Sequence, residues 1–121
     1  MKLSLLVLIG SALGGLSRFW LGIWSVALLG PDFPWGTMGI NVLGSFAIGL
    51  AATALPVEAS PARALVMIGL CGGFTTFSSY SLQTYELLRA DRIVAALGYT
   101  GGSVAACLAA TALGWWVGRM V

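Results

Sequence analysis

The stretch CGGFTTFSSY, Cys71–Tyr80, lies inside the third long apolar segment of this chain and decides how that segment folds. A helix that crosses a membrane is normally continuous and mostly apolar. Here two adjacent glycines lower the helix propensity, and the hydroxyl groups that follow compete for backbone hydrogen bonds. The stretch therefore predicts a helix that breaks at mid-membrane. Irregular backbone at that depth survives only inside protein or along a water-filled cavity, so the break also marks a candidate site.

The composition is that of a membrane protein. Of 121 residues, 59% are hydrophobic and only 8% are charged, which lies outside the ordinary soluble range. A membrane helix needs about 20 apolar residues, and four stretches supply them. They cover residues 3–29, 36–55, 63–88 and 93–117, with short turns between them. We therefore expect an all-α integral membrane protein, a single membrane domain over residues 1–121, with four transmembrane helices and the third one broken.

The opening MKLSLLVLIGSALGG has the Lys, the apolar run and the small residues of a cleavable signal peptide. However, the apolar character continues past Arg18 through FWLGIWSVALL, which is too long for the core of a signal peptide. We expect this segment to stay attached as the first span.

Basic residues divide almost evenly between the two faces of the membrane. Lys2, Arg63 and Arg119 lie on the side of the termini, and Arg89 and Arg92 lie on the other. Because orientation follows this bias, an excess of one leaves two interpretations open: insertion both ways up, which permits an antiparallel homodimer, or one orientation set by an insertion factor.

Glycine pairs four residues apart are typical of close helix packing, although a glycine-rich chain meets that spacing easily. They are Gly10/Gly14, Gly69/Gly73, Gly98/Gly102 and Gly114/Gly118. Four short helices enclose little, so we expect the chain to form an oligomer.

Polar residues recur every four positions in two spans, which places them near one helix face. They are Thr37, Asn41 and Ser45 in the second span, and Tyr99, Ser103, Cys107 and Thr111 in the fourth. A Ser or Thr can bond to its own helix. The Asn41 amide cannot, so it must meet a partner helix, water or a solute, and both an interhelical contact and a conduction role stay open.

The charged and aromatic residues argue against a cation pathway or proton relay and are compatible with an anion, although backbone carbonyls freed at the break would suit a hard cation. No carboxylate lies in the middle of a span, whereas cation pathways and proton relays normally need one. Arg18 lies deep in the first span and adds positive potential. Phe77 and Tyr80 share a helix face, and an aromatic ring presents a positive edge to an anion, although simple packing is the alternative. The chain has no His, and both Cys lie in apolar stretches as expected of free thiols, so neither a transition-metal site nor an enzyme is expected.

Three segments together resemble the CrcB/Fluc family of bacterial fluoride channels. They are GGFTTFSS (72–79), GTMGINVLGSFAIG (36–49) and GGLSRFWL (14–21). The match covers all four spans in order, and its third-span motif is specific. The resemblance implies a dual-topology, antiparallel homodimer with two fluoride pores and a structural sodium ion at its centre. It further implies passive export of fluoride across the bacterial cytoplasmic (inner) membrane, which confers fluoride resistance.

The resemblance also assigns roles to individual residues. Asn41 would donate its amide to fluoride, Phe77 would offer its ring edge, and the backbone carbonyls of Gly72 and Thr75 would bind sodium. The remaining predicted residues of the fluoride pathway are Tyr80, Ser103, Cys107, Thr111, Thr37 and Arg18. Two of them depart from the family pattern: Tyr80 stands where a Phe is usual, and Cys107, a weaker donor, stands where a Ser is common.

Two other functions remain as alternatives. A small four-helix drug/proton antiporter would need an embedded carboxylate, which the chain lacks. A non-transporting membrane assembly subunit would use the glycine pairs for packing and Asn41 as an interhelical contact, and it would pass no ions. The expected partners are fluoride, a second copy of the chain and the lipid bilayer; without a basic run, nucleic acid is not expected.

Overall fold

The computed structural model describes residues 1–58 and 60–121, and within them the chain forms helices and turns but no strand. Three spans are single helices: α1 (Lys2–Leu29), α2 (Trp35–Ala54) and α6 (Ile93–Gly118). The third is divided into α3 (Pro61–Arg63), η1 (Ala64–Cys71), α4 (Gly72–Phe74) and α5 (Phe77–Arg89). All four are long and apolar enough to cross a membrane, which confirms the predicted all-α architecture.

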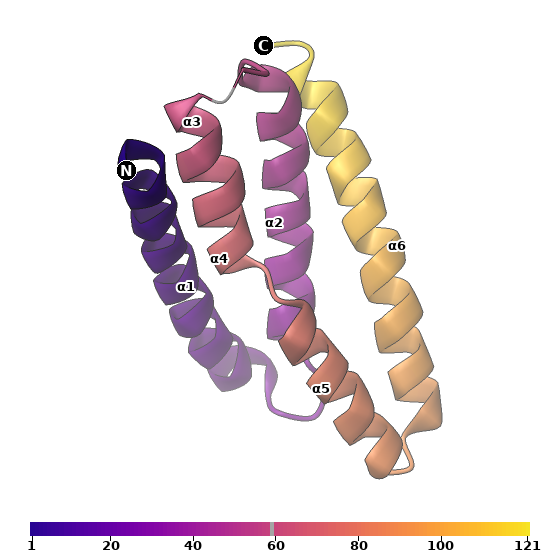
Figure 1. Cartoon of the computed structure of the whole chain (residues 1–121). Coiled ribbons are helices and arrows are strands. Elements are labelled where there is room, and N and C mark those ends of the chain that lie inside the picture. The colour runs from indigo at the N-terminus through magenta and orange to yellow at the C-terminus, as the bar shows by residue number, and fades with distance from the viewer. Residues whose placement is uncertain (59) are drawn as a thin grey trace.

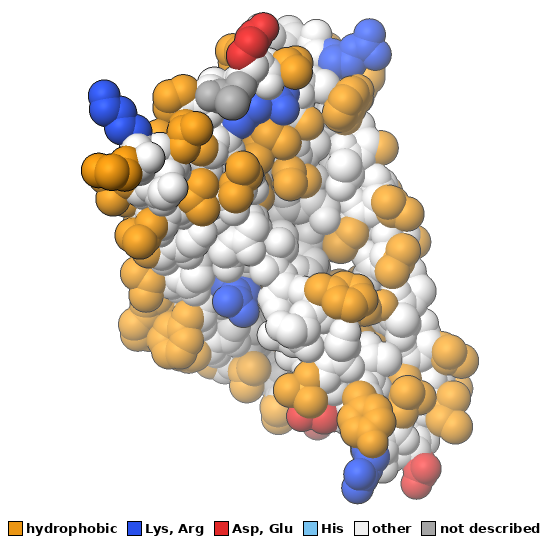
Figure 2. Space-filling model, in the orientation of Figure 1, with side chains coloured by type: hydrophobic (Ala, Val, Ile, Leu, Met, Phe, Trp, Pro, Cys, Tyr) orange, Lys and Arg blue, Asp and Glu red, His pale blue; other side chains and the backbone are white. Residues whose placement is uncertain are grey.

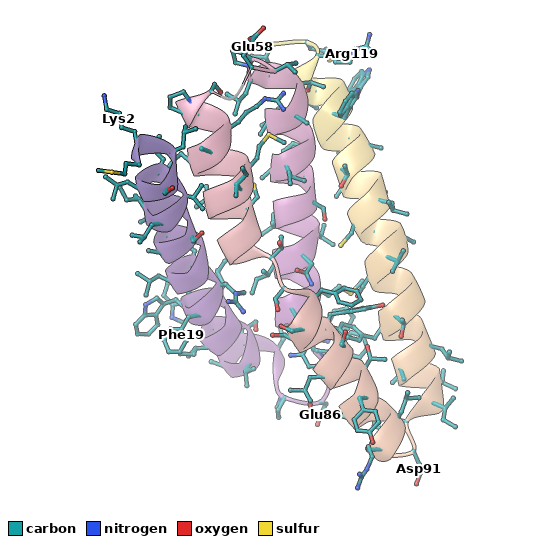
Figure 3. The ribbon with its side chains drawn as sticks, in the orientation of Figure 1. Lys2, Phe19, Glu58, Glu86, Asp91 and Arg119 are labelled. Carbon is teal, nitrogen blue, oxygen red and sulfur yellow. The ribbon has the colours of Figure 1, made fainter. Side chains whose placement is uncertain are left out.

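Both chain termini lie at the same end of the bundle, as four spans require (Figure 1). Charged side chains gather at the two ends, and an isolated basic side chain lies midway along the visible face (Figure 2). Lys2, Glu58 and Arg119 lie at the end that holds the termini, whereas Glu86 and Asp91 lie at the opposite end (Figure 3). The two charged ends mark the membrane surfaces, and the apolar length between them marks the hydrocarbon region.

The third span breaks where the sequence predicts it. Thr75 and Thr76 have extended backbone, with φ/ψ of −81°/159° and −151°/116°, between α4 and α5. Before the break, η1 and α4 pack against α1; after it, α5 packs against α6 (Figure 1). The break therefore allows a single span to change its neighbour halfway through the membrane.

The half of the span before the break is a π-helix, a feature that the sequence did not predict. It runs over the eight residues Ala64–Cys71, whereas π-helical geometry usually occupies a single turn and is frequent at functional sites. It leads directly into Gly72 and Gly73.

Glycines allow the helices to approach each other at the level of the backbone. A Cβ atom added at Gly10 would lie 2.3 Å from the Leu65 carbonyl oxygen, and one added at Gly14 would lie 2.3 Å from that of Leu70. The α2–α6 contact has the same character, because a Cβ at Gly114 would lie 2.1 Å from the Phe46 carbonyl oxygen.

Three of the four predicted glycine pairs thus pack tightly, and the fourth does not. A Cβ at Gly98 would meet nothing within 4 Å, and one at Gly102 would make only an ordinary contact of 3.6 Å with the Met38 methyl group. Spacing alone therefore did not distinguish packing glycines from free ones.

We expect Gly114→Ala to destabilise the subunit, because the added methyl group forces α2 away from α6 at a backbone contact. Overpacking of this kind costs about 1–3 kcal/mol. The measurement is the midpoint of thermal aggregation in detergent, followed by size-exclusion chromatography. Gly98→Ala is the matched control on the same helix; equal midpoints for the two variants would contradict the packing role of Gly114.

Candidate functional site

A cavity of about 380 Å³ lies beside the break, between α2, the third span and α6. We call it the break cavity. It brings together most of the predicted site residues: Asn41, Gly72, Thr75, Phe77, Tyr80, Ser103 and Cys107. These residues come from three spans, so the tertiary fold, rather than any local sequence segment, builds the site.

The Asn41 side chain holds the break open. Its Nδ2 donates to the Thr76 carbonyl oxygen at 3.1 Å, and its Oδ1 accepts from the Thr76 N–H at 2.8 Å. The amide thus pairs with both the backbone N–H and the backbone C=O of Thr76, which would otherwise be unsatisfied in lipid. The interhelical contact expected for Asn41 is therefore present, and a carboxamide has a second N–H for another acceptor.

Two backbone carbonyl groups lose their helical donors at the break, one through Asn41 and one through the Thr76 hydroxyl. In a continuous α-helix the Gly72 carbonyl would accept from the Thr76 N–H, and the Thr75 carbonyl would accept from the Ser79 N–H. The Thr76 N–H donates to Asn41 instead, and the Ser79 N–H donates to the Thr76 hydroxyl oxygen at 3.2 Å. Both carbonyls to which the family resemblance assigns a sodium ion thus lose their helical donors, and both residues line the break cavity.

Arg18, on α1, binds a further backbone carbonyl at the break, that of Gly73. Its Nε donates to the Gly73 carbonyl oxygen at 3.2 Å. Arg18 also lines a second cavity of about 600 Å³, together with Thr37, Thr76 and Ser79, which we call the arginine cavity. A cation this far from a helix end is expensive in lipid unless it faces protein or water, and Arg18 does so here.

Thr76 lines both cavities. Its hydroxyl oxygen also caps the start of α5, where unpaired N–H groups carry the partial positive charge of a helix N-terminus. We did not predict Thr76 as a site residue. The signal was available, since a Thr immediately before an amphipathic segment is typical of a helix N-cap.

The two aromatic residues beside the break are placed differently from each other. Phe77 is 78% exposed, and its ring centroid lies 5.4 Å from that of Tyr80. The Tyr80 hydroxyl donates to the Thr100 carbonyl oxygen of α6 at 3.2 Å. The extra hydroxyl of this chain is therefore engaged by the protein, and the Tyr80 ring keeps an orientation set by α6.

On α6, Ser103 and Cys107 face the break cavity one helical turn apart. The Ser103 Oγ is buried and has no hydrogen-bond partner among the described residues. Cys107 is a half-buried free thiol. An unpaired buried hydroxyl is costly, so the cavity suits a ligand or water that can accept from it.

Two predicted pathway residues lie away from the break cavity for a geometric reason. A step of four residues turns an α-helix about 40° beyond a full circle, so such a row drifts around the helix. Thr37 accordingly faces the arginine cavity, whereas Asn41 and Ser45 line the break cavity. At the other end of the fourth-span row, Thr111 is not among the described residues that line either cavity; its carbonyl packs at Gly49.

Known proteins are similar to this chain over nearly its whole length. The family model described as "CrcB-like protein, Camphor Resistance (CrcB)" matches residues 5–115. A protein of Methylocella silvestris named fluoride-specific ion channel FluC is 48% identical, covering 95% of this chain and 88% of its own length.

Two further relatives carry the same kind of name. FluC 1 of Rhodopseudomonas palustris is 45% identical over 96% of this chain and 83% of its own, and FluC of Paramagnetospirillum magneticum is 49% identical over 90% and 89%. The chain therefore belongs to the CrcB family, whose curated members include proteins named fluoride-specific ion channels.

Proposed function

We propose that this chain is a fluoride-selective channel that lets the ion leave the cell passively across the cytoplasmic membrane. The observation that carries the proposal is the pair of cavities that both have Thr76 in their walls. One contains a fixed positive charge, and the other contains neutral hydrogen-bond donors and aromatic ring edges. The names of the relatives support fluoride as the ion.

In this proposal the arginine cavity is the mouth of the pathway. Arg18 and the N-terminus of α5 raise the local anion concentration. Thr37 and Ser79 add hydroxyl donors there. The Arg18 Nε donates to the Gly73 carbonyl, and this bond fixes the position of the side chain. The Arg18 charge therefore attracts an anion at the mouth without moving with it along the pathway.

Beyond Thr76 the ion exchanges water for protein donors in the break cavity. Fluoride is small and strongly hydrated, so several donors must replace its water while holding it weakly enough to let it leave. The donors are the second N–H of Asn41, the hydroxyl of Ser103, which has no partner among the residues that the structure describes, and the thiol of Cys107. The ring edges of Phe77 and Tyr80 contribute without a formal charge. We place Thr111 further along the α6 row.

We infer that the working unit is an antiparallel homodimer with two pores. Phe77 lies at mid-span yet is 78% exposed in a single subunit, and a second copy covers it in this arrangement. The nearly even division of Lys and Arg between the two faces supports insertion both ways up.

A sodium ion at the dimer centre fits the residues present. The Gly72 and Thr75 carbonyls have lost their helical partners, and backbone carbonyls are the hard oxygen ligands that such a cation takes. When bound, the ion supplies positive charge that holds these carbonyls together. The pathway residues themselves do not contact it in this proposal.

A non-transporting assembly subunit is the second candidate, favoured by the two hydrogen bonds of Asn41 to Thr76. That function needs no pathway and leaves the Ser103 hydroxyl unexplained. It predicts no ion flux.

The first test is passive efflux from liposomes that hold the purified protein. Vesicles loaded with fluoride or chloride are given valinomycin to balance charge, and ion-selective electrodes record the release. We expect rapid fluoride loss with chloride retained. If folded, dimeric protein releases neither ion, the channel function is wrong and the assembly role stands.

We expect Phe77→Ile to reduce fluoride flux at least about tenfold, the effect of losing about 1.4 kcal/mol of stabilisation along the pathway. The substitution replaces ring edges with methyl groups and preserves apolar volume. Tyr80→Phe is the matched control, because it keeps the ring and removes only the bond to Thr100, so its flux should stay comparable to wild type. Unchanged flux in Phe77→Ile would remove that ring from the pathway.

We expect Asn41→Leu to abolish fluoride flux, because the Thr76 peptide group loses both of its partners and the break closes or misfolds. Thr53→Val is the control. It removes an interhelical hydrogen bond from the same helix, at 3.2 Å to the Trp115 carbonyl, and should conduct normally. Efflux and oligomeric state are both measured; an Asn41→Leu protein that conducts normally but dissociates would assign Asn41 to assembly alone.

A further inference from the structure

Two free thiols line the break cavity from opposite elements. Cys71 ends η1 and is only 3% exposed, whereas Cys107 lies on α6 and is partly exposed. Conduction needs hydrogen-bond donors at this level, and a thiol is a poorer donor than a hydroxyl. A thiol does, however, bring a chemical reactivity that a hydroxyl lacks.

The surroundings of Cys107 decide whether that reactivity is available. A thiol packed in apolar protein is inert, whereas one in a partly exposed polar setting reacts. One turn away, Ser103 is only 4% exposed and lines the same cavity. Its Oγ has no hydrogen-bond partner among the described residues. A hydroxyl in that position calls for water or another acceptor inside the cavity. Cys107 is therefore partly exposed at the break cavity, one turn from an unsatisfied hydroxyl, rather than enclosed in a packed core.

We propose that Cys107 is a modification site at which small, uncharged thiol-reactive electrophiles close the ion pathway; the inference rests on the proposed channel function. With a thiosulfonate, the Cys107 thiolate attacks the divalent sulfur. A new disulfide bond forms, the bond between the divalent sulfur and the sulfonyl sulfur breaks, and a sulfinate leaves with the electron pair. The thiol proton passes to water.

The modification acts on the pathway in two ways. It removes the S–H donor, and it places an apolar alkylthio group beside the Ser103 hydroxyl, where the ion has to exchange its water. A neutral reagent suits the site because the surrounding walls are largely apolar and Arg18 repels cations from the neighbouring cavity. Cys71, being almost fully buried, provides an internal comparison within the same cavity.

The experiment uses full-length protein in fluoride-loaded liposomes treated with methyl methanethiosulfonate. Wild type, Cys71→Ser, Cys107→Ser and the double variant are compared, each against its own untreated flux, and intact mass counts the methylthio groups per subunit. We expect wild type and Cys71→Ser to gain a group at Cys107, lose most of their flux and recover it with dithiothreitol. Cys107→Ser should keep its own untreated flux after the same treatment.

Three outcomes overturn the inference: a Cys107 that stays unmodified, a modified Cys107 with unchanged flux, or a block that Cys71→Ser removes. The experiment tests the proposed channel function and the modification of Cys107 separately. If the untreated protein passes no fluoride, the channel function fails and the blocking claim fails with it. The mass measurement then still decides whether Cys107 faces a hydrated cavity.

Discussion

A peptide group inside a membrane must find its hydrogen-bond partner within the protein, and at the break that partner is the Asn41 amide. The rest of the structure depends on this pairing. It stabilises the extended Thr75–Thr76 segment, releases the Gly72 carbonyl, and lets the third span pass from contact with α1 to contact with α6. The proposed conducting role of Asn41 is compatible with this structural one, because an amide has a second N–H to donate.

Positive charge and neutral donors are kept apart around the break. Arg18 reaches the Gly73 carbonyl from the arginine cavity, while the break cavity has donors without formal charge. In the proposed pathway, a cation placed among the tightest contacts would trap an anion, whereas one at the mouth attracts it and then releases it. Tight glycine contacts make this separation possible, since α1 can lie close enough to the third span for the Arg18 side chain to reach the break.

Much of this arrangement could be predicted from residue types and their order. Composition and length gave the four spans, and Gly72, Gly73 and the following hydroxyls located the break. Three features could not be obtained in that way. The π-helix of Ala64–Cys71 packs against α1 and has no marker among its apolar residues. Thr111 and Thr37 follow the four-residue spacing, but drift around the helix turns them away from the break cavity. The partner of the Tyr80 hydroxyl lies on another span, so no local pattern reveals it.

The break also has a consequence for how the chain is made. Membrane segments enter the bilayer in order, and the third arrives with a peptide group that its own helix cannot satisfy. Asn41, on the span inserted just before it, is already in the bilayer. The carbonyl that the Tyr80 hydroxyl uses belongs to the last span. The subunit is therefore expected to assemble in the order of its spans. The second span supplies the hydrogen-bond partners that the third needs, and the fourth accepts the hydrogen bond from Tyr80.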